Sequence, residues 1–450
     1  MKSRCQKLIP LALVLVLTGA SGVDLPPLIE AAKNTDWVAV QNLLEEGADP
    51  TATAPDGATA LHWASYWDEV EVVELLIQNG ADVNAANELG ATPLWSASLN
   101  GSVDMVRSLL AAGADPDAAL LSGEAPVMTA ARTGNPEVLE LILSAGADPN
   151  VRATRSQTAL MWAVAQQHVD AARVLLEHGA DIHARSETWG QLMAVPPHSL
   201  NKQIVPHGGN TPLLFAARVG DLPSARLLVS YGADVDDADA WGISATTLAA
   251  HSGFHEFVEF MLDKGADPNA DEEGFSPLHM AIMRRDEDLV GKLLAHGADP
   301  NARISTWTPT RRASRDWSLH PSLIGATPFW LAARFSEPGI MHLLAEHGAD
   351  PLFVHEVKYI ASAGTYGGGG VTEATTALMA AVGMGGPRRM RAFLPSDPTE
   401  LEAKALEAVK LTVELGVDVH ATDLEGQTAS DRAGFLSIMD FLRSTEATRP

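Results

Sequence analysis

Apolar residues recur along the chain in pairs of short helical patterns. In residues 58–84, Leu61 and Ala64 lie three positions apart, and Val70 and Val73 follow at the same spacing. Apolar positions three or four apart fall on one face of an α-helix. The stretch therefore predicts two short amphipathic helices, and similar pairs throughout the chain predict an all-α fold.

A short phrase, Leu-Leu-x-x-Gly-Ala-Asp, closes each pair and repeats along the sequence. Its first four steps are 33 residues each, whereas three later steps are longer by insertions. A fixed period of this length is typical of stacked-repeat proteins, in which each unit buries its apolar side against its neighbours. The glycine of the phrase occurs at Gly47, Gly80, Gly113, Gly146, Gly179, Gly232, Gly265, Gly297, Gly348 and, in a degenerate copy, Gly416.

The ends of these helices are marked by residue type. A hydroxyl residue before a proline suits the start of a helix, because the side chain caps a free backbone amide and proline fits the first helical position. The glycine of the phrase suits the end of the second helix, where a left-handed conformation is common. The start signals are Thr92-Pro93, Thr211-Pro212, Ser276-Pro277 and Thr327-Pro328.

Together these motifs resemble the ankyrin repeat. The closest match is the segment Ser276-Pro277-Leu278-His279-Met280-Ala281 with Gly297-Ala298-Asp299-Pro300-Asn301. The resemblance implies an α-solenoid of helix–turn–helix units joined by β-hairpin loops, spanning residues 23–442, with a flexible tail at 443–450. A truncated unit at 427–442 would cap ten complete units that begin near Leu25, Ala58, Ala91, Glu124, Thr158, Asn210, Ile243, Phe275, Ala326 and Val371.

Four insertions interrupt the period. Directly after the last, Thr399 and Glu402 form a capping-box pattern that predicts a lengthened helix running to Leu415. The glycine run 367–370 is expected to be mobile. Insertions of this length are usually functional or disordered. They lie near residues 185–209, 303–325, 353–373 and 384–398.

The N-terminus predicts a secretory signal peptide at residues 1–22. Three basic residues precede an apolar run from Leu8 to Leu17, and small residues then allow cleavage after Ala20 or Gly22. An uncleaved anchor is the alternative, although the run is short for a membrane span. The only cysteine, Cys5, lies in this segment, so the mature chain would form no disulfide. We expect an exported protein, periplasmic or secreted, similar to exported bacterial multi-ankyrin proteins.

The chain is strongly acidic, with a formal net charge of -26 at pH 7. General nucleic-acid binding needs a basic face that displaces counterions from phosphates. The charge argues against that function and favours basic or polar partners, or simply solvated acidic helix faces.

No motif assembles a catalytic or metal site. His255 is followed by Glu259 where a zinc-protease helix has its second histidine. The pattern around Asp267 lacks the final carboxylate of a calcium loop. The resemblance gives His62 and His279 a structural role, bonding the backbone of the neighbouring hairpin. We expect no metal, no cofactor and no enzymatic activity.

The resemblance also assigns binding positions. The two residues after the paired alanines of each first helix line the concave groove of the family. Tyr66 and Trp67 are bulky there, as binding hot spots often are, and the arginines would lie on one side of the groove. Those arginines either grip carboxylates of a partner or pair with acidic residues of adjacent units. The candidate partner-binding residues are Tyr66, Trp67, Leu99, Asn100, Arg132, Arg218, Met283, Arg284, Arg334 and Phe335, with Trp241 at a hairpin tip.

The insertions add a second candidate surface, rich in aromatic and basic residues. We interpret the chain as a monomeric, non-catalytic scaffold for a protein partner. Its alternatives are an enzyme with a site built by the insertions and a structural spacer. The insertion residues concerned are Trp307, Arg311, Arg312, Arg315, Trp317, Arg388, Arg389 and Arg391.

Overall fold

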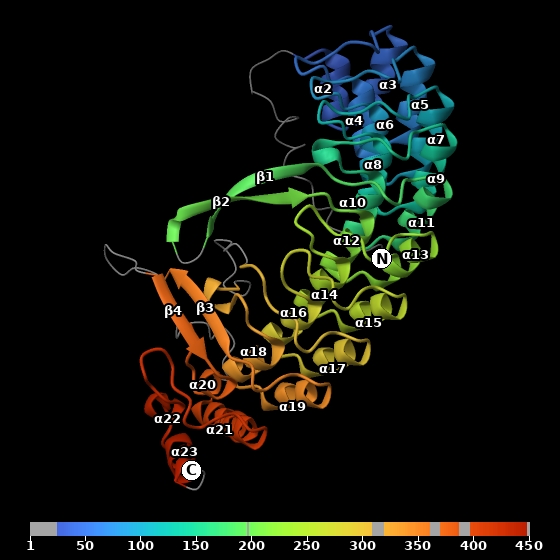
Figure 1. Ribbon diagram of the computed structural model, residues 1–450. Helices are drawn as coiled ribbons and strands as arrows, with labels where there is room; N and C mark the ends of the chain where they lie inside the picture. The colour runs from blue at the N-terminus through green and yellow to red at the C-terminus, as the bar shows by residue number, and fades with distance from the viewer. Residues whose placement is uncertain (1–24, 196–197, 308–318, 361–369, 387–396, 448–450) are drawn as a thin grey trace. The chain divides into compact units, whose positions relative to one another are not determined.

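The structure is a computed structural model in which residues 25–195, 198–307, 319–360, 370–386 and 397–447 are described. The chain divides between Ala184 and Arg185 into two compact units, and the helices of both carry labels in Figure 1. The signal segment predicted at residues 1–22 lies outside the described residues, as do residues 367–369 of the glycine run. Gly370 begins a strand.

The first unit is a stack of helix pairs, and successive pairs follow the predicted period. A short 3₁₀ turn, η1 (Thr154–Ser156), lies in one connection. The pairs in its described part are α2 (Pro27–Lys33) with α3 (Trp37–Glu45), α4 (Ala60–Trp67) with α5 (Val70–Gln78), α6 (Pro93–Asn100) with α7 (Val103–Ala111), α8 (Pro126–Thr133) with α9 (Pro136–Ser144), and α10 (Ala159–Ala165) with α11 (Val169–Glu177).

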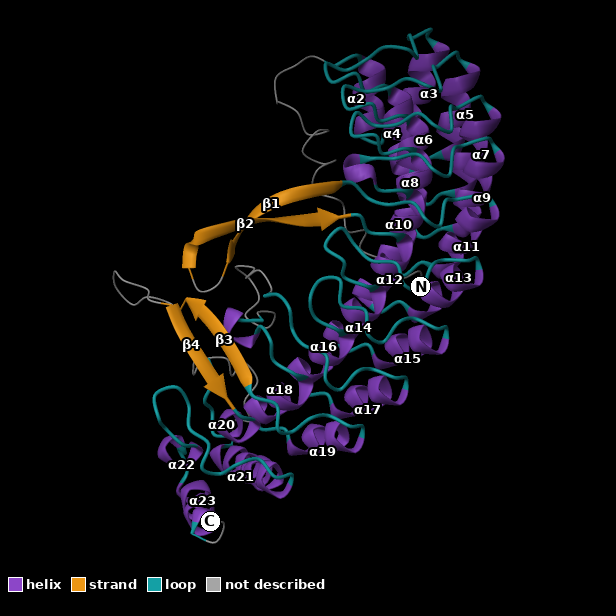
Figure 2. Cartoon of the chain, in the orientation of Figure 1, coloured by secondary structure: helices purple, strands orange, loops and turns teal. Residues whose placement is uncertain are grey.

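The second unit continues the same architecture and carries two β-hairpins (Figure 2). Its strands are β1 (Thr188–Val195), β2 (His198–Gly208), β3 (His355–Ile360) and β4 (Gly370–Thr375), and η3 (Pro321–Leu323) is a 3₁₀ turn. Its helix pairs are α12 (Pro212–Val219) with α13 (Leu222–Ser230), α14 (Ala245–Ser252) with α15 (His255–Asp263), α16 (Pro277–Arg284) with α17 (Glu287–Ala295), α18 (Pro328–Phe335) with α19 (Pro338–Glu346), α20 (Ala377–Ala381) with α21 (Pro398–Glu414), and α22 (Ala429–Arg432) with α23 (Leu436–Glu446).

The core runs through the first helices of the pairs. In the first unit α4, α6, α8 and α10 pack one on the next, and so do α5, α7, α9 and α11. Leu61, Leu94 and Leu160 occupy equivalent positions on α4, α6 and α10 and are fully buried. Burying a leucine side chain contributes about 2 kcal/mol, and small alanines allow the helices to approach closely. The predicted repeat architecture is therefore confirmed.

Hydrogen bonds from an asparagine side chain join one repeat to the next. Asn84 ends the phrase Gly-Ala-Asp-Val-Asn; its Nδ2 donates to the Gly113 carbonyl oxygen at 3.1 Å, and its Oδ1 accepts from the Asp115 amide at 2.7 Å. Such a residue satisfies two backbone groups of its neighbour. The same pair of hydrogen bonds is formed by Asn150, Asn269 and Asn301.

Two of the insertions form antiparallel hairpins, which an all-α prediction did not include. The hairpin of β1 and β2 fills the insertion at 185–209, and that of β3 and β4 fills the insertion at 353–373. The insertions at 185–209 and 303–325 enter and leave the stack through paired backbone. Ser186 donates its amide to the Asn210 carbonyl oxygen at 3.0 Å, and Ile304 donates to Ala326 at 3.1 Å.

The last repeats depart from the prediction in detail. The tenth pair begins at Ala377 rather than near Val371, which lies in β4. The lengthened helix, α21, is present, but Asp397 rather than Thr399 caps it, accepting from the Thr399 amide at 2.8 Å. The terminal pair, α22 and α23, runs to Glu446, so residues 443–446 are helical and not part of a flexible tail. Among the described helices, none is long and apolar enough to cross a membrane.

Candidate functional site

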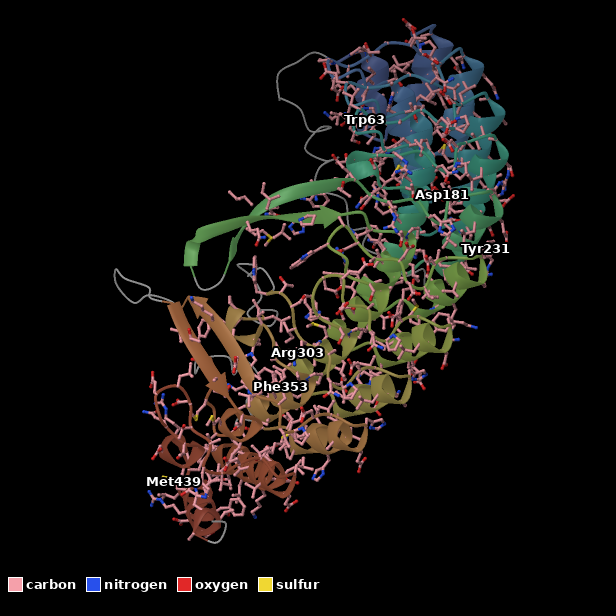
Figure 3. The ribbon with its side chains drawn as sticks, in the orientation of Figure 1. Trp63, Asp181, Tyr231, Arg303, Phe353 and Met439 are labelled. Atoms are coloured by element: carbon pink, nitrogen blue, oxygen red, sulfur yellow. The ribbon has the colours of Figure 1, made fainter. Side chains whose placement is uncertain are left out.

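An aromatic cluster lies at the C-terminal end of α4 in the first unit. The Tyr66 and Trp67 rings meet edge to face, with centroids 5.1 Å apart, and Trp63 meets Tyr66 at 6.3 Å. The Lys33 ammonium lies 5.9 Å from the centre of the Trp63 ring (Trp63 is labelled in Figure 3). Trp67 is 46% exposed. We call Trp63, Tyr66 and Trp67 the aromatic patch.

Local structure explains why the patch projects from a buried helix. Residues Ala60 to Ser65 of α4 are buried by the neighbouring first helices. The helix ends at Trp67, because the next residue, Asp68, has a left-handed conformation. The Nδ2 atom of Asn100 donates to the Tyr66 carbonyl oxygen at 2.8 Å and to the Ser65 carbonyl oxygen at 3.2 Å. Asn100, predicted as a binding residue, therefore positions the backbone beneath the patch.

A small hollow adjoins the patch and connects it to the next hairpin. It encloses about 20 Å³ and is lined by Trp63, Tyr66, His62 and, from the next repeat, Asn87 and Ala91. This volume suits a single small group rather than a whole ligand. The neighbouring Leu99, also a predicted binding residue, is half-buried.

Two exposed leucines at hairpin tips were missed by the sequence analysis. Leu89 is 44% exposed and Leu121 is 80% exposed, and the Leu121 amide donates to the Leu89 carbonyl oxygen at 2.9 Å. Turn tips usually carry glycine or polar residues. A leucine at the tip in two successive repeats is the signal that marks them in the sequence. Both lie in the first unit with the aromatic patch.

Arg132 engages residues of its own unit. Its guanidinium pairs with the Glu124 carboxylate at 2.9 Å and lies 5.5 Å from the centre of the Trp162 ring. The Trp162 indole donates to Gln157 Oε1 at 3.0 Å. The acidic partner of Arg132 lies in its own repeat and not in an adjacent one, and a role for this arginine in binding stays a prediction.

In the second unit, Arg218 and Arg284 are exposed but also bond the array. Arg218 donates to Asn210 Oδ1 at 3.0 Å, and Arg284 donates to the His251 carbonyl oxygen at 2.8 Å. Met283 is half-buried, as is Trp241 at its hairpin tip. Arg132 belongs to the other unit, so a single side shared by all the arginines stays a prediction.

Arg334 and Phe335 are buried, and their predicted role in binding is wrong. Arg334 is 3% exposed and donates from Nε to the Gly385 carbonyl oxygen at 2.9 Å. The Arg285 guanidinium lies 5.8 Å from the centre of the Phe335 ring. The turn after α20 covers this end of α18, because α20 ends at Ala381 and the chain then brings the Gly385 carbonyl oxygen to Arg334. Neither side chain can reach a partner.

The aromatic and basic residues of the insertions fall mostly outside the described residues. Trp307 is described and half-buried. The structure describes nothing of Arg311, Arg312, Arg315, Trp317, Arg388, Arg389 and Arg391.

The two motif histidines have the structural role that the resemblance implied. The His62 Nε2 atom lies 2.9 Å from the Ala91 carbonyl oxygen, and His279 Nε2 lies 3.2 Å from that of Ala302. Burial lowers the pKa of both imidazoles, that of His279 to about 4. They are thus neutral donors to a neighbouring repeat. Predicted roles and geometry agree here.

Other titratable groups form pairs rather than a reactive centre. His255 bonds Asp286 at 2.6 Å and Asp288 at 3.0 Å, which joins two repeats. Burial raises the pKa of Glu273 to about 8. In the part of the chain that the structure describes, no group of three or more histidine, cysteine, aspartate or glutamate residues is placed to hold a metal ion.

Stacked helix pairs joined by hairpin turns, with side chains linking each pair to the next, define a helical-repeat solenoid. The model for ankyrin repeats (3 copies) matches residues 28–120, 113–186 and 213–304, and a second model, ankyrin repeats (many copies), matches residues 160–229. The first model alone covers more than half of the chain. The chain belongs to the ankyrin repeat family.

Individual relatives match over short stretches. Ankyrin repeat and SAM domain-containing protein 6 of Mus musculus is 34% identical over 94 residues, which is 20% of this chain and 10% of that protein. E3 ubiquitin-protein ligase KEG of Arabidopsis thaliana is 33% identical over 91 residues, 20% of this chain and 6% of the ligase. Ankyrin repeat domain-containing protein 29 of Danio rerio is 40% identical over 62 residues, 14% of this chain and 21% of the other.

One of the matching solved structures is also an ankyrin repeat domain. The crystal structure of the human ASB11 ankyrin repeat domain is 29% identical, covers 54% of this chain and 99% of that domain, and gives a TM-score of 0.44. The chain spans about a tenth or less of the length of the first relatives and about a fifth of the fish protein. Ankyrin repeats are generally protein-interaction modules, and this chain carries an array of them.

Proposed function

We propose that this protein is an exported scaffold that binds a protein partner through the first unit, with Trp67 as the anchor. The observation that carries the proposal is an exposed tryptophan, 46% accessible, held edge to face against Tyr66 at the end of a rigid helix. Tryptophan and tyrosine dominate binding hot spots because each buries a large area with few rotatable bonds.

The surroundings of the anchor support the proposal. Asn100 fixes the backbone of Tyr66, so the patch is pre-organised and loses little entropy on binding. Leu89 and Leu121 add exposed apolar area at the hairpin tips of the same unit. A solvated spacer would carry polar residues at these places, so the apolar side chains favour the scaffold over the spacer.

The charge of the chain indicates the character of the partner. A net charge of -26 attracts a basic surface and speeds encounter at low ionic strength. We infer a partner with a basic rim around an apolar pocket that receives Trp67. Raising the salt concentration should then slow association more than it speeds dissociation.

Export is part of the proposal and has its own test. The basic residues before Leu8 and the apolar run to Leu17 support a signal peptide. Mass spectrometry of the protein purified from its native cell should give a chain that begins after Ala20 or Gly22. An intact N-terminus on the native protein would contradict export by cleavage.

The partner is sought by capture from native extract and then measured with purified components. The double variant Tyr66→Ala, Trp67→Ala removes the anchor. The variant Tyr231→Ala is the matched control, because Tyr231 is 45% exposed but lies in the second unit. We expect the double variant to bind the purified partner at least about tenfold more weakly, a loss of about 1.4 kcal/mol.

The outcomes distinguish binding at the aromatic patch from binding at the insertions. If the control binds normally and the double variant does not, while both keep the helical circular dichroism of the parent, the patch is the site. If the double variant binds like the parent, the proposed anchor is wrong. The insertions then become the surface to delete.

A further inference from the structure

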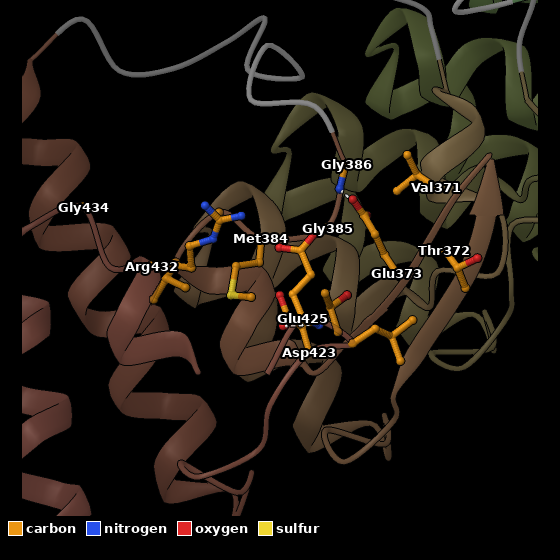
Figure 4. Close-up of a pocket in the computed structure, with 14 residues that line it drawn as sticks. Val371, Thr372, Glu373, Met384, Gly385, Gly386, Asp423, Glu425, Arg432 and Gly434 are labelled. Atoms are coloured by element: carbon orange, nitrogen blue, oxygen red, sulfur yellow. Dashed lines mark hydrogen bonds between the residues drawn. The ribbon is translucent and has the colours of Figure 1, made fainter. Parts of the chain in front are cut away.

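A pocket lies near the C-terminal end of the second unit, away from the aromatic patch. It encloses about 390 Å³ between β4, the turn at residues 382–386, the hairpin at residues 423–425, and the end of α22 (Figure 4). Volumes of this size are typical of sites for small molecules. One wall is apolar, formed by Val371, Val382, Met384 and Leu424.

A buried hydroxyl in the lining has no hydrogen-bond partner within the chain. Thr375, at the end of β4, is 3% exposed, and its Oγ1 atom bonds no other described group. A buried polar group without a partner is costly, so it is usually satisfied by a ligand or water. The hydroxyl is close to Gly385, where an added Cβ would lie 3.2 Å from Oγ1. The residue that lines the pocket at this point therefore carries a hydroxyl that can still donate or accept a hydrogen bond.

Glu373 is held in a fixed orientation on the same strand. One carboxylate oxygen accepts from the Tyr359 hydroxyl at 2.9 Å, and the other accepts from the Gly386 amide at 2.8 Å, the bond drawn in Figure 4. Burial raises the pKa of Tyr359, and its hydrogen bond to Glu373 acts in the same direction. The tyrosine therefore stays a neutral donor, and its hydrogen bond fixes the orientation of the Glu373 side chain.

The opposite rim carries charges of both signs. Asp423 Oδ1 accepts from the amides of Glu425 and Gln427 at 2.9 and 2.8 Å, which orders the hairpin. The Glu425 carboxylate and the Arg432 guanidinium are exposed in the same lining. Among the described residues, neither enters an ion pair. Three carboxylates and one guanidinium thus meet around an apolar wall.

We propose that this pocket binds a basic amino acid, either free or as the C-terminal residue of a peptide. Its ammonium or guanidinium group pairs with Glu425 and Glu373, its carboxylate pairs with Arg432, and its methylenes lie on Val382 and Met384. Long basic side chains combine an apolar stem with a charged end in this way, and arginine binds carboxylates in a bidentate manner.

The arrangement of charges selects against simpler ligands. A purely cationic molecule gains from the carboxylates but is repelled by Arg432. A purely anionic molecule gains from Arg432 but is repelled by the three carboxylates. A ligand with both charges pairs with the carboxylates and with Arg432 at the same time. Its amino or carboxylate group can also hydrogen-bond a hydroxyl such as that of Thr375.

The test is calorimetric titration of the full chain with L-arginine, L-lysine and agmatine, which lacks the carboxylate. We expect both amino acids to bind, and agmatine to bind about tenfold more weakly. The variant Arg432→Gln should lose that preference and bind agmatine no worse than L-arginine. Glu425→Gln should weaken all three, whereas Glu407→Gln, an exposed charge change on α21, should weaken none.

Two peptides separate the sources of the ligand. A peptide ending in a free arginine should bind if the site reads a C-terminus, and its amidated form should not. If only the free amino acids bind, the site is closed to peptides and the ligand is a free amino acid. Absence of binding by every probe at millimolar concentration would overturn the proposal.

Thr375→Val provides a readout that does not depend on charge. Valine has the shape of threonine without the hydroxyl, so the variant should be at least as stable as the parent to urea. The same variant should bind L-arginine several-fold more weakly. A variant that is more stable and binds normally would show that the hydroxyl serves no ligand, and would overturn this part of the site.

Discussion

The Oδ1 atom of Asn301 accepts a hydrogen bond from the Asp350 amide at 2.8 Å, across 49 positions of sequence. The corresponding bond, from the Asp115 amide to Asn84 Oδ1, spans 31 positions. The insertion at 303–325 therefore lies between two repeats whose link is unchanged. The asparagine that ends the Gly-Ala-Asp-x-Asn phrase therefore bonds the next repeat of the stack even when an insertion lies between them.

Replacing Asp117 with asparagine should stabilise the first unit. Asp117 accepts from the Asp148 amide at 2.9 Å, as the asparagines do, but a carboxylate has no hydrogen to donate. The variant Asp117→Asn gains a donor for the carbonyl oxygen of Gly146. We expect a gain of about 1 kcal/mol in the free energy of unfolding, measured with urea. The reciprocal change, Asn84→Asp, should cost a similar amount, and equal stability of all three proteins would refute the link.

Arg334 and Arg218 should respond very differently to truncation. Arg334 is buried and bonds the Gly385 carbonyl oxygen, so Arg334→Ala leaves an unfilled space and an unsatisfied acceptor. We expect a loss of about 3 kcal/mol in unfolding free energy. Arg218 is exposed, and Arg218→Ala should cost no more than about 0.5 kcal/mol. Similar losses for the two variants would contradict the assignment of Arg334 to the core.

Glu273 should make the protein less stable as the pH rises. Burial raises its pKa from an ordinary value near 4.5 to about 8, and Asp239 and Asp271 add to the shift. Between these two values the folded chain holds a proton that the unfolded chain releases, so the free energy of unfolding falls with increasing pH. Each pKa unit corresponds to about 1.4 kcal/mol.

The variant Glu273→Gln isolates this effect. The amide keeps the shape of the acid but does not ionise, so the variant should gain stability relative to the parent between about pH 5 and pH 8. Urea unfolding of both proteins at the two pH values measures the difference, and titration of all other groups cancels. A constant difference between parent and variant would disprove the raised pKa.

The pKa of His279 should lie below the ordinary histidine value of 6.5, and that of His296 should lie above it. Burial lowers the pKa of His279 to about 4, whereas the bond to the Lys292 carbonyl oxygen, then Asp263, raises that of His296. The unfolded chain binds a proton at His279 below about pH 6.5 that the folded chain refuses, so stability is lost as the pH falls from there to about 4. Nuclear magnetic resonance of the imidazole carbons gives both midpoints, and a single shared midpoint would contradict the two environments.

Much of the array could be predicted because its signals are local. The period of the Gly-Ala-Asp phrase placed the repeats, and Thr92 with Pro93 marked a helix start that the structure confirms. His62 and His279 could be assigned because the family's histidine bonds the next hairpin in every repeat of that type. These features depend on residues within one unit and its neighbour.

The rest depends on contacts that no local pattern encodes. The position of Arg334 after the paired alanines of its helix predicts a place in the groove, but α20 ends at Ala381 and the Gly385 carbonyl oxygen in the following turn accepts from the arginine. The pairing of β1 with β2 and the pocket beside β4 arise from strands within insertions, whose pairing across many residues has no counterpart in the repeat. Exposed tip leucines were visible in the sequence but have meaning only once the turns are placed.

At the insertions at 185–209 and 303–325, the backbone is paired where the inserted segment begins and ends, so residues can be added there without lengthening the stack. Ser186 and Asn210 are hydrogen-bonded neighbours, as are Ile304 and Ala326, so the ends of each inserted segment are already held together by the repeats on either side. A segment exchanged at these points would meet no closure cost beyond its own ordering. The array thus provides ready junctions at which new recognition elements can be gained or lost while the repeats retain their neighbours.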